Sequence, residues 1–393
     1  MIKPFSFTGT PKITFGAGSF AKVPRIMRKM GRNALIITGV SSHNEAGRFD
    51  KLVEDLKKDN LRIYHVKVKA EPSPEFIDAV CVDHRDKNIN VVLGWGGGSA
   101  IDAGKAVSAM IPQRGPTIDF LEKVGTGARL NGVKVPYIAV PTTSGTGSEA
   151  TKNAVLRKVG PKGFKNSLRH DSLVPDETII DPELMLSCPP EVTAACGMDA
   201  FTQLLEAYVS TNAGAMTDAL ALSGLECVRD NLIRVSTDGA RDIDARAGMA
   251  YASLASGIAL ANAGLGLVHG IAGPLGGLFD IPHGAACGTL MGAAFSAIVD
   301  KLLEDPGADQ SAVRKFAKVG SLFMFTGSTD IRTGCNMLVE KINEMTVTLK
   351  MPRLGKFGIK ESDLDAIAAA SDNKYSPAQL STDEIRAVVK SRL

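Results

Sequence analysis

The chain has 393 residues, of which 44% are hydrophobic, 22% charged and 5% aromatic, and its formal net charge is +3. This length is enough for two ordinary domains, and the composition is that of a globular protein with ample core material. Because the net charge is small, we expect neither nucleic acid nor a membrane among its partners. No apolar run reaches about 18 residues, so the sequence indicates no membrane-spanning helix.

Six cysteines are scattered along the chain, and none of them belongs to a CxxC pair. This spacing is typical of reduced, mostly buried thiols, and the first residues lack the long apolar stretch of a signal peptide. We therefore expect a cytoplasmic protein without disulfide bonds.

The first part of the chain alternates between short apolar runs and segments in which apolar residues have helical spacing. The apolar runs, which we predict to be buried strands, cover residues 34–38, 61–68, 91–93 and 134–140. Helical spacing occupies residues 23–30, 47–58, 72–87 and 100–110. Strands that alternate with helices predict a parallel, doubly wound sheet, so we expect residues 1–184 to form an α/β domain.

The pattern changes towards the second half of the chain. Residues 151–183 look irregular and partly stranded, and strand signals nearly vanish beyond residue 185. Ala- and Leu-rich segments with helical spacing then cover residues 190–211, 213–235, 241–263, 284–303, 308–324 and 332–348. We predict an all-α domain over residues 185–393, and because no long linker separates the halves, the two domains are expected to share a cleft.

A glycine turn, Gly96-Gly97-Gly98-Ser99, lies between the apolar run at residues 89–93 and the helical segment at residues 100–110. Glycines let the backbone approach a ligand closely, and a helix N-terminus presents free N–H groups and a positive dipole end. The turn therefore suits a phosphate or pyrophosphate. The pattern is neither GxGxxG nor a Walker loop, and a tight strand-to-helix turn without a ligand is the alternative interpretation.

Three side chains of the second half form a candidate metal site. Asp199 lies in an apolar helical segment, and His269 and His283 lie in glycine-rich surroundings. One carboxylate and two imidazoles suit catalytic Zn²⁺ with an open position, or Fe²⁺ in a facial triad. Gln203 follows Asp199 by one helical turn and shares its face. The alternative is that these are buried structural groups with backbone partners.

We assign none of the remaining histidines to the metal site. We expect them on loops or at the surface, at positions 43, 65, 84 and 170.

The glycine turn and the candidate ligands belong to longer sequence motifs. Four of these occur, in this order: GWGGGSAIDAGKAV, PTTSGTGSEAT, GMDAFTQLLEAYVS with the preceding DPELM, and LGLVHGIAGPLGGLFDIPHG. Together they resemble the iron-containing (group III) alcohol dehydrogenases, relatives of glycerol dehydrogenase and dehydroquinate synthase. The resemblance covers nearly the whole chain. It implies an N-terminal nucleotide-binding α/β domain, a helical C-terminal domain, and reversible NAD(P)-linked reduction of an aldehyde or ketone to an alcohol.

In that family the glycine loop holds the cofactor pyrophosphate, a threonine-rich loop lines the cofactor, and a downstream lysine lies near the nicotinamide. By resemblance, the cofactor-binding positions here are Gly97, Gly98, Ser99, Asp102, Thr142, Thr143, Thr146 and Lys165. The family's metal ligands are one aspartate and three histidines, which map to Asp199, Gln203, His269 and His283.

Three features depart from the family pattern. Gln203 replaces a ligand histidine, and an amide oxygen is a poorer donor than imidazole to a borderline-soft metal. Gly273 replaces a histidine that helps to relay a proton in many members, so no proton path is assigned. Gly39 and Ser41 stand where NAD-preferring members often have an acid near the ribose. Because no carboxylate would repel a 2′-phosphate there, we expect NADP(H) to be favoured over NAD(H).

The resemblance therefore implies a metal-dependent alcohol dehydrogenase or aldehyde reductase that acts on a small-molecule alcohol or aldehyde. Asp199, His269 and His283 are the expected catalytic residues, because Fe²⁺ or Zn²⁺ held by them would polarise the carbonyl oxygen that receives the hydride. By the same resemblance we expect a homodimer or a larger homo-oligomer.

Three other functions remain open. The first alternative is a metal-independent reductase that resembles maleylacetate reductase, in which Gln203 and the histidines donate hydrogen bonds to the substrate. A lyase that resembles dehydroquinate synthase would need a basic cluster, and none is present near residues 197–203 or 264–284. A non-catalytic nucleotide-binding protein would have no need for Asp199, His269 and His283.

Overall fold

The computed structural model describes residues 4–40, 47–305, 307, 309–327 and 330–393. Its N-terminal half is built around a six-stranded sheet in which every neighbouring pair is parallel. In spatial order the strands are β1 (Lys12–Phe15), β8 (Glu177–Ile180), β5 (Tyr137–Pro141), β4 (Val91–Gly96), β2 (Asn33–Gly39) and β3 (Arg62–Val68).

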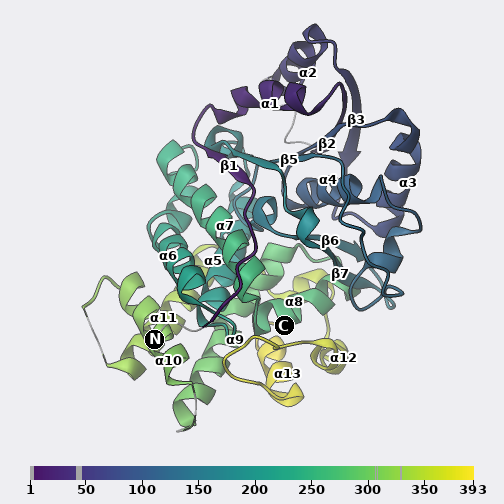
Figure 1. The fold of residues 1–393 in the computed structure, drawn as a ribbon. Coiled ribbons are helices and arrows are strands. Elements are labelled where there is room, and N and C mark those ends of the chain that lie inside the picture. The colour runs from purple at the N-terminus through teal and green to yellow at the C-terminus, as the bar shows by residue number, and fades with distance from the viewer. Residues whose placement is uncertain (1–3, 41–46, 306, 308, 328–329) are drawn as a thin grey trace.

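Helices cover both faces of this sheet (Figure 1). They are α1 (Val23–Met30), α2 (Arg48–Lys58), α3 (Pro74–His84) and α4 (Gly98–Met110). Successive residues of β2 serve opposite cores, because side chains alternate across a strand. Ile36 shares a buried cluster with Met27 of α1, whereas Leu35 shares one with Ile77 of α3 and Val107 of α4. The predicted doubly wound parallel sheet is confirmed.

An antiparallel pair of strands, β6 (Asn153–Lys158) and β7 (Phe164–Arg169), lies outside the parallel sheet. The sequence predicted only partly stranded structure here. The hairpin packs between the two halves of the chain, with β6 against α4 and β7 against α8 (Leu267–Leu278). One side of it therefore faces the boundary between the domains.

The C-terminal half is helical, as predicted. Besides α8, its helices are α5 (Pro190–Val209), α6 (Ala215–Ser236), α7 (Ile243–Ala263), α9 (His283–Glu304), α10 (Gln310–Phe323), α11 (Ile331–Thr348), α12 (Leu364–Ala370) and α13 (Thr382–Ser391). A single large apolar cluster, with Phe201, Leu290 and Phe316 fully buried, joins most of them.

The sequence did not predict α8, because four glycines and Pro274 lie within it and both residue types disfavour helices. Tertiary packing holds it instead. A Cβ on Gly270 would overlap the carbonyl oxygen of Asp372, and a Cβ on Gly277 would lie 2.8 Å from the Cα of Phe164. The glycines thus allow the backbones of neighbouring segments to approach α8 closely.

Helix α9 is long and apolar enough to cross a membrane by composition. In the structure 67% of its most apolar window is buried. It packs against α5, α8, α11 and α13 within the helical core.

The carboxyl ends of β4 and β5 point towards the helical half, and their loops contact it. Gly147, in the loop after β5, packs directly on Gly257 of α7, where a Cβ on Gly147 would lie 2.5 Å from the Cα of Gly257. This contact brings the strand-end loops beside the helices, which is the arrangement that creates ligand clefts in open α/β sheets.

Candidate active site

A cavity of about 2150 Å³ lies between the two halves of the chain. Its walls include the glycine turn, the loop after β5, the β6–β7 hairpin, and parts of α5, α8 and α9. The predicted shared cleft is therefore present, and it is large enough for a dinucleotide and a small substrate together.

The glycine turn forms one wall of the cavity. Gly97 is the N-cap of α4, and the helix begins at Gly98, so the first free N–H groups of α4 lie beside the cavity. The turn also contacts the loop after β5: a Cβ on Gly98 would lie 2.8 Å from Cγ2 of Thr146, and one on Gly97 would lie 3.4 Å from Cγ2 of Thr143. A side chain at position 98 would therefore force the side chain of Thr146 to move.

Most of the expected cofactor positions line this cavity, namely Gly97, Gly98, Ser99, Asp102, Thr143, Thr146 and Lys165. Thr142 does not line it: the residue is buried, and its backbone N–H donates to the carbonyl of Gly96, which supports the turn. Gly39 ends β2 next to Gly96 and is also outside the cavity wall. Ser41 lies outside the described residues.

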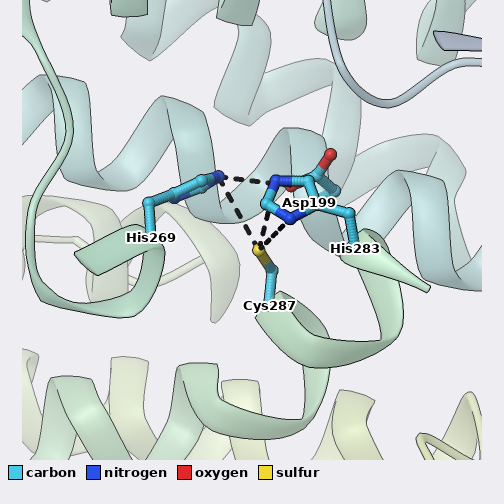
Figure 2. A group of neighbouring side chains, drawn as sticks. All are labelled: Asp199, His269, His283 and Cys287. Atoms are coloured by element: carbon cyan, nitrogen blue, oxygen red, sulfur yellow. Dashed lines mark hydrogen bonds and ion pairs between the residues drawn. The ribbon is translucent and has the colours of Figure 1, made fainter. Parts of the chain in front are cut away.

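Four side chains of the helical half form a donor cluster, shown in Figure 2. Asp199 is in the middle of α5, His269 is in the first turn of α8, and His283 and Cys287 are one turn apart at the start of α9. One ligand atom from each residue lies within 4.8 Å of all the others. The structure thus brings together the three donors that the sequence singled out and adds a thiol.

The distances within the donor cluster are those of a metal site. Nε2 of His269 lies 3.3 Å and Nε2 of His283 lies 3.6 Å from Oδ1 of Asp199. That oxygen is buried, and neither ring nitrogen meets it with hydrogen-bond geometry. A buried carboxylate oxygen without a partner is costly, and a bound cation would remove the cost. The residues present therefore fit a divalent metal ion.

A second carboxylate orients one of the histidines. Nδ1 of His269 lies 2.6 Å from Oε2 of Glu206, and the other oxygen of Glu206 accepts a hydrogen bond from the backbone N–H of Val268. A carboxylate that holds the far nitrogen of an imidazole is the usual outer partner of a metal-bound histidine.

Two family models match the chain: "Iron-containing alcohol dehydrogenase" over residues 10–182, and "Fe-containing alcohol dehydrogenase family, C-terminal" over residues 193–393. The chain belongs to the iron-containing alcohol dehydrogenase family.

Individual relatives agree with this assignment. Long-chain-alcohol dehydrogenase 1 of Geobacillus thermodenitrificans is 33% identical over 380 residues, 94% of this chain and 91% of the relative. The NADPH-dependent butanol dehydrogenase of Clostridium saccharobutylicum is 30% identical over 97% of this chain and 96% of the relative. The structure of the alcohol dehydrogenase from Oenococcus oeni superposes with a TM-score of 0.87 at 26% identity, covering 99% of this chain and 100% of that one.

The side chains of the donor cluster have pKa values that are shifted from their usual range. Burial would raise the pKa of Asp199, but the charges of the neighbouring His283 and His269 lower it to about 2. Burial lowers the pKa of His283 to about 4, and the nearby Lys165 lowers it further. Burial also raises the pKa of the Cys287 thiol to about 11. Asp199 is thus an anion and His283 a neutral imidazole. Burial lowers the pKa of His269, but the neighbouring Cys287 and Glu206 raise it well above its usual value, so His269 and the Cys287 thiol would each lose a proton when a metal binds.

Gln203, the residue at the family's histidine position, lines the cavity beside Asp199. It is 3% exposed, and its Oε1 atom accepts a hydrogen bond of 2.7 Å from the hydroxyl of Ser256 on α7. The same hydroxyl lies 2.8 Å from the carbonyl of Ser253, so Ser256 of α7 holds the carboxamide of Gln203 in place.

Lys165 lies in an ion-pair network on the hairpin side of the cavity. Its Nζ atom is 2.8 Å from Oε2 of Glu71, and the same carboxylate lies 3.4 Å from Nε of Arg157. Arg157 also pairs with Asp280 at 2.7 Å, just before His283. This network links the cofactor side of the cavity to the loop that precedes His283.

Asp102 and Lys105 connect α4 to the hairpin behind the glycine turn. Asp102 accepts hydrogen bonds from the Ser148 hydroxyl and from the backbone N–H of Val155. Lys105 is 1% exposed and donates to the backbone carbonyls of Ser148, Thr151 and Asn153. Burial lowers the pKa of Lys105 to about 8 and raises that of the neighbouring Glu149 to about 7.

Two site residues were missed from the sequence, although a signal for each was present. Glu206 follows Gln203 by three residues and so shares the α5 face of Asp199, and Cys287 follows His283 by four residues on α9. Both positions were predictable from helical spacing, once the helices were known to carry a site.

The expectation for the other histidines is partly wrong. His84 lies on α3, is 7% exposed, and hydrogen-bonds through Nδ1 to the carbonyl of Val80. His65 lies within β3 but is exposed at the surface, as expected, and its Nε2 atom is 2.8 Å from the hydroxyl of Thr38. His170 lies in a loop, and His43 is outside the described residues.

Proposed function

We propose that this protein is a metal-dependent, NAD(P)H-linked alcohol dehydrogenase that interconverts small alcohols with aldehydes or ketones. One observation carries the proposal: the donor cluster of Asp199, His269 and His283 and the glycine turn at Gly97 and Gly98 belong to the same cavity. A hydride donor and a carbonyl-polarising group must lie within one enclosed space for this reaction.

Asp199, His269 and His283 would hold the metal, which we propose to be Fe²⁺ or Zn²⁺. When bound, such an ion supplies a Lewis acid for the substrate oxygen, and a bound nicotinamide cofactor supplies or accepts the hydride. Glu206 orients the ring of His269 towards Asp199, which keeps the cluster assembled without the substrate.

The glycine turn and the N-terminus of α4 would hold the cofactor pyrophosphate. Gly97 and Gly98 leave room for its close approach, and the free N–H groups of the first turn of α4 suit its charge. The threonine-rich loop packs against the turn through Thr143 and Thr146, so both loops line the cofactor side.

NADP(H) is the proposed cofactor in preference to NAD(H). The support is Gly39, which ends β2 beside Gly96 of the glycine turn, at the carboxyl ends of the strands, and carries no carboxylate. A 2′-phosphate would meet no negative side chain at that position.

Gly273 has open space at its position: a Cβ there would meet no atom within 4 Å. It lines the cavity four residues after His269. We infer that the proton of the alcohol leaves through solvent in the open cavity rather than through a side chain at this position.

The proposed domains are residues 1–184, for the cofactor, and 185–393, for the metal and the substrate. We also propose a cytoplasmic homodimer or larger homo-oligomer. Light scattering on the purified protein tests the second point, and a monomeric mass would overturn it.

The experiment that tests the function combines metal analysis with turnover. The protein is purified without oxygen or chelator, its metal content is measured, and it is assayed with a panel of aldehydes and alcohols. We expect about one Fe or Zn per chain and aldehyde reduction that a chelator abolishes.

His283→Ala should abolish turnover while cofactor binding, measured by nucleotide fluorescence, stays within about twofold of the parent. His170→Ala, at a loop position that does not line the cavity, is the matched control and should keep full activity. Near-native activity of His283→Ala, or activity without bound metal, would instead favour a metal-independent reductase.

A further inference from the structure

The thiol of Cys287 has no assigned role in the proposed chemistry, yet it belongs to the donor cluster. It lies on α9 one turn after His283, so both side chains project from the same face of that helix (Figure 2). Its Sγ atom is 3.7 Å from Nε2 of His269 and 3.8 Å from Nε2 of His283.

We propose that Cys287 binds the metal as a thiolate and is the fourth protein ligand, in place of a donor at position 203. This inference rests on the proposed metal-dependent function and adds a ligand to its site. The site would then be one carboxylate, two imidazoles and one thiolate.

The distances between the donor atoms agree with this ligand set. Around a tetrahedral zinc ion, bond lengths of about 2.1 Å to nitrogen or oxygen and about 2.3 Å to sulfur place the ligand atoms roughly 3.4 Å (N and O) and 3.6 Å (S and N) apart. The measured separations of Asp199 Oδ1 from the two histidine nitrogens are 3.3 and 3.6 Å, and those of Cys287 Sγ are 3.7 and 3.8 Å. All four measured separations agree with these expected ligand-to-ligand distances to within a few tenths of an ångström.

Two further observations point to a cation at the centre of these four atoms. Oδ1 of Asp199 is buried, belongs to a side chain that is 2% exposed, and has no hydrogen-bond partner. The amide oxygen of Gln203, the donor expected from the family pattern, already accepts the hydroxyl proton of Ser256. The cluster therefore has an unsatisfied anionic donor, and the amide at position 203 is a weaker metal donor than a thiolate.

The position of Cys287 leaves room for the substrate. Asp199, His269 and His283 line the cavity, whereas Cys287 is fully buried and lies behind them, outside the cavity wall. A thiolate there would complete four protein ligands from the side away from the cavity, and a substrate oxygen that enters from the cavity would be a fifth ligand, an expansion that zinc allows.

A thiolate also changes which metal the site prefers. Thiolate is a softer ligand than imidazole or an amide oxygen and favours Zn²⁺ over harder ions. Binding requires the deprotonated sulfur, so the thiol proton is released to solvent when the metal enters. We therefore infer that zinc, rather than iron, is the preferred ion of this chain.

The first test needs no variant. Zinc-loaded protein is examined by X-ray absorption at the zinc edge, and we expect one sulfur scatterer at about 2.3 Å together with nitrogen and oxygen scatterers. The cobalt-substituted protein should show thiolate-to-cobalt charge-transfer absorption in the near ultraviolet.

The second test uses Cys287→Ser, with Cys335→Ser as the matched control. Cys335 is a buried cysteine of α11 whose thiol contacts the carbonyl of Val313, outside the cavity. Cys287→Ser should lose the charge-transfer band and bind zinc about 10- to 100-fold more weakly, a loss at least as large as that for an outer-shell partner. Cys335→Ser should keep the band and the affinity.

The outcomes separate this inference from the proposed function. Zinc bound at one ion per chain without a sulfur scatterer would overturn the thiolate ligand and leave metal-dependent dehydrogenase activity standing. A sulfur scatterer in a protein that turns over no alcohol or aldehyde would leave the ligand standing and overturn the function. Absence of metal binding in the parent protein would overturn both.

Discussion

Oε2 of Glu206 lies 2.6 Å from Nδ1 of His269. The other oxygen of Glu206 accepts a hydrogen bond from the backbone N–H of Val268, which is 62 residues further along the chain. The carboxylate is 2% exposed, so water does not compete for either contact. Val268 and His269 both lie in the first turn of α8, where a nearby negative side chain is favourable. Glu206 therefore anchors α8 to α5 and turns Nε2 of His269 towards Asp199.

Glu206→Gln should weaken metal binding by about 10- to 100-fold, because an amide still accepts from Val268 but no longer polarises the imidazole. The affinity is measured by competition with a chromogenic chelator. Glu226→Gln, at an exposed position of α6, is the control and should bind as the parent does. Equal affinities for both variants would mean that Glu206 serves only to hold α8.

Gly98→Ala should raise the KM for the cofactor roughly tenfold, because a Cβ would lie 2.8 Å from Cγ2 of Thr146 and displace that side chain, which lines the cofactor side. Alanine favours the first turn of a helix, so the unfolding midpoint should change little. Gly355→Ala, where a Cβ meets only an ordinary contact at 3.8 Å, is the control. Unchanged cofactor kinetics in Gly98→Ala would argue against the glycine turn as the pyrophosphate site.

Gly39→Asp should lower the NADPH-to-NADH ratio of kcat/KM by at least about tenfold, because a carboxylate at the end of β2 repels a 2′-phosphate and can bind the ribose hydroxyls. Gly39→Asn is the matched variant with the same shape and no charge. If both variants shift the ratio equally, the effect is steric, and the absence of an acid does not decide cofactor choice.

Glu149→Gln should stabilise the protein at pH 8 by about 1–3 kcal/mol. Burial raises the pKa of Glu149 from 4.5 to about 7, so the folded state holds this proton more tightly than the unfolded chain does. The cost of an ionised Glu149 is therefore fully present above pH 7 and disappears as the pH falls towards 4.5. Urea unfolding at pH 8 and pH 5 measures the difference, which should be larger at pH 8.

The matched control is Glu340→Gln, at an exposed position of α11. Its stability should follow that of the parent at both pH values. A stabilisation by Glu149→Gln that is the same at pH 5 and pH 8 would show that ionisation is not its cause.

The N-terminal architecture was predictable because its signals are local. The apolar runs of β2, β4 and β5 and the glycine turn before α4 each lie within a few consecutive residues. Their alternation with helices is sufficient to predict a parallel sheet, because parallel strands need crossover connections. The long helices of the second half were likewise predictable from their repeating apolar faces.

Helix α8 was not predictable, because its formation is decided by its neighbours. Its own residues disfavour a helix, and its stability comes from close packing at Gly270 and Gly277 against Asp372 and Phe164. Propensity is a weak guide where tertiary contacts supply most of the stabilisation.

The sequence by itself determined the two fold classes, the position of the glycine turn, and the identity of Asp199, His269 and His283 as candidate ligands. The tertiary structure decided which other groups join them. It placed Glu206 behind His269, brought the thiol of Cys287 to within 3.7 Å of Nε2 of His269, and engaged Gln203 with Ser256. These contacts join α5, α7, α8 and α9, and distances between separate helices depend on how the helices pack, which no short stretch of sequence encodes.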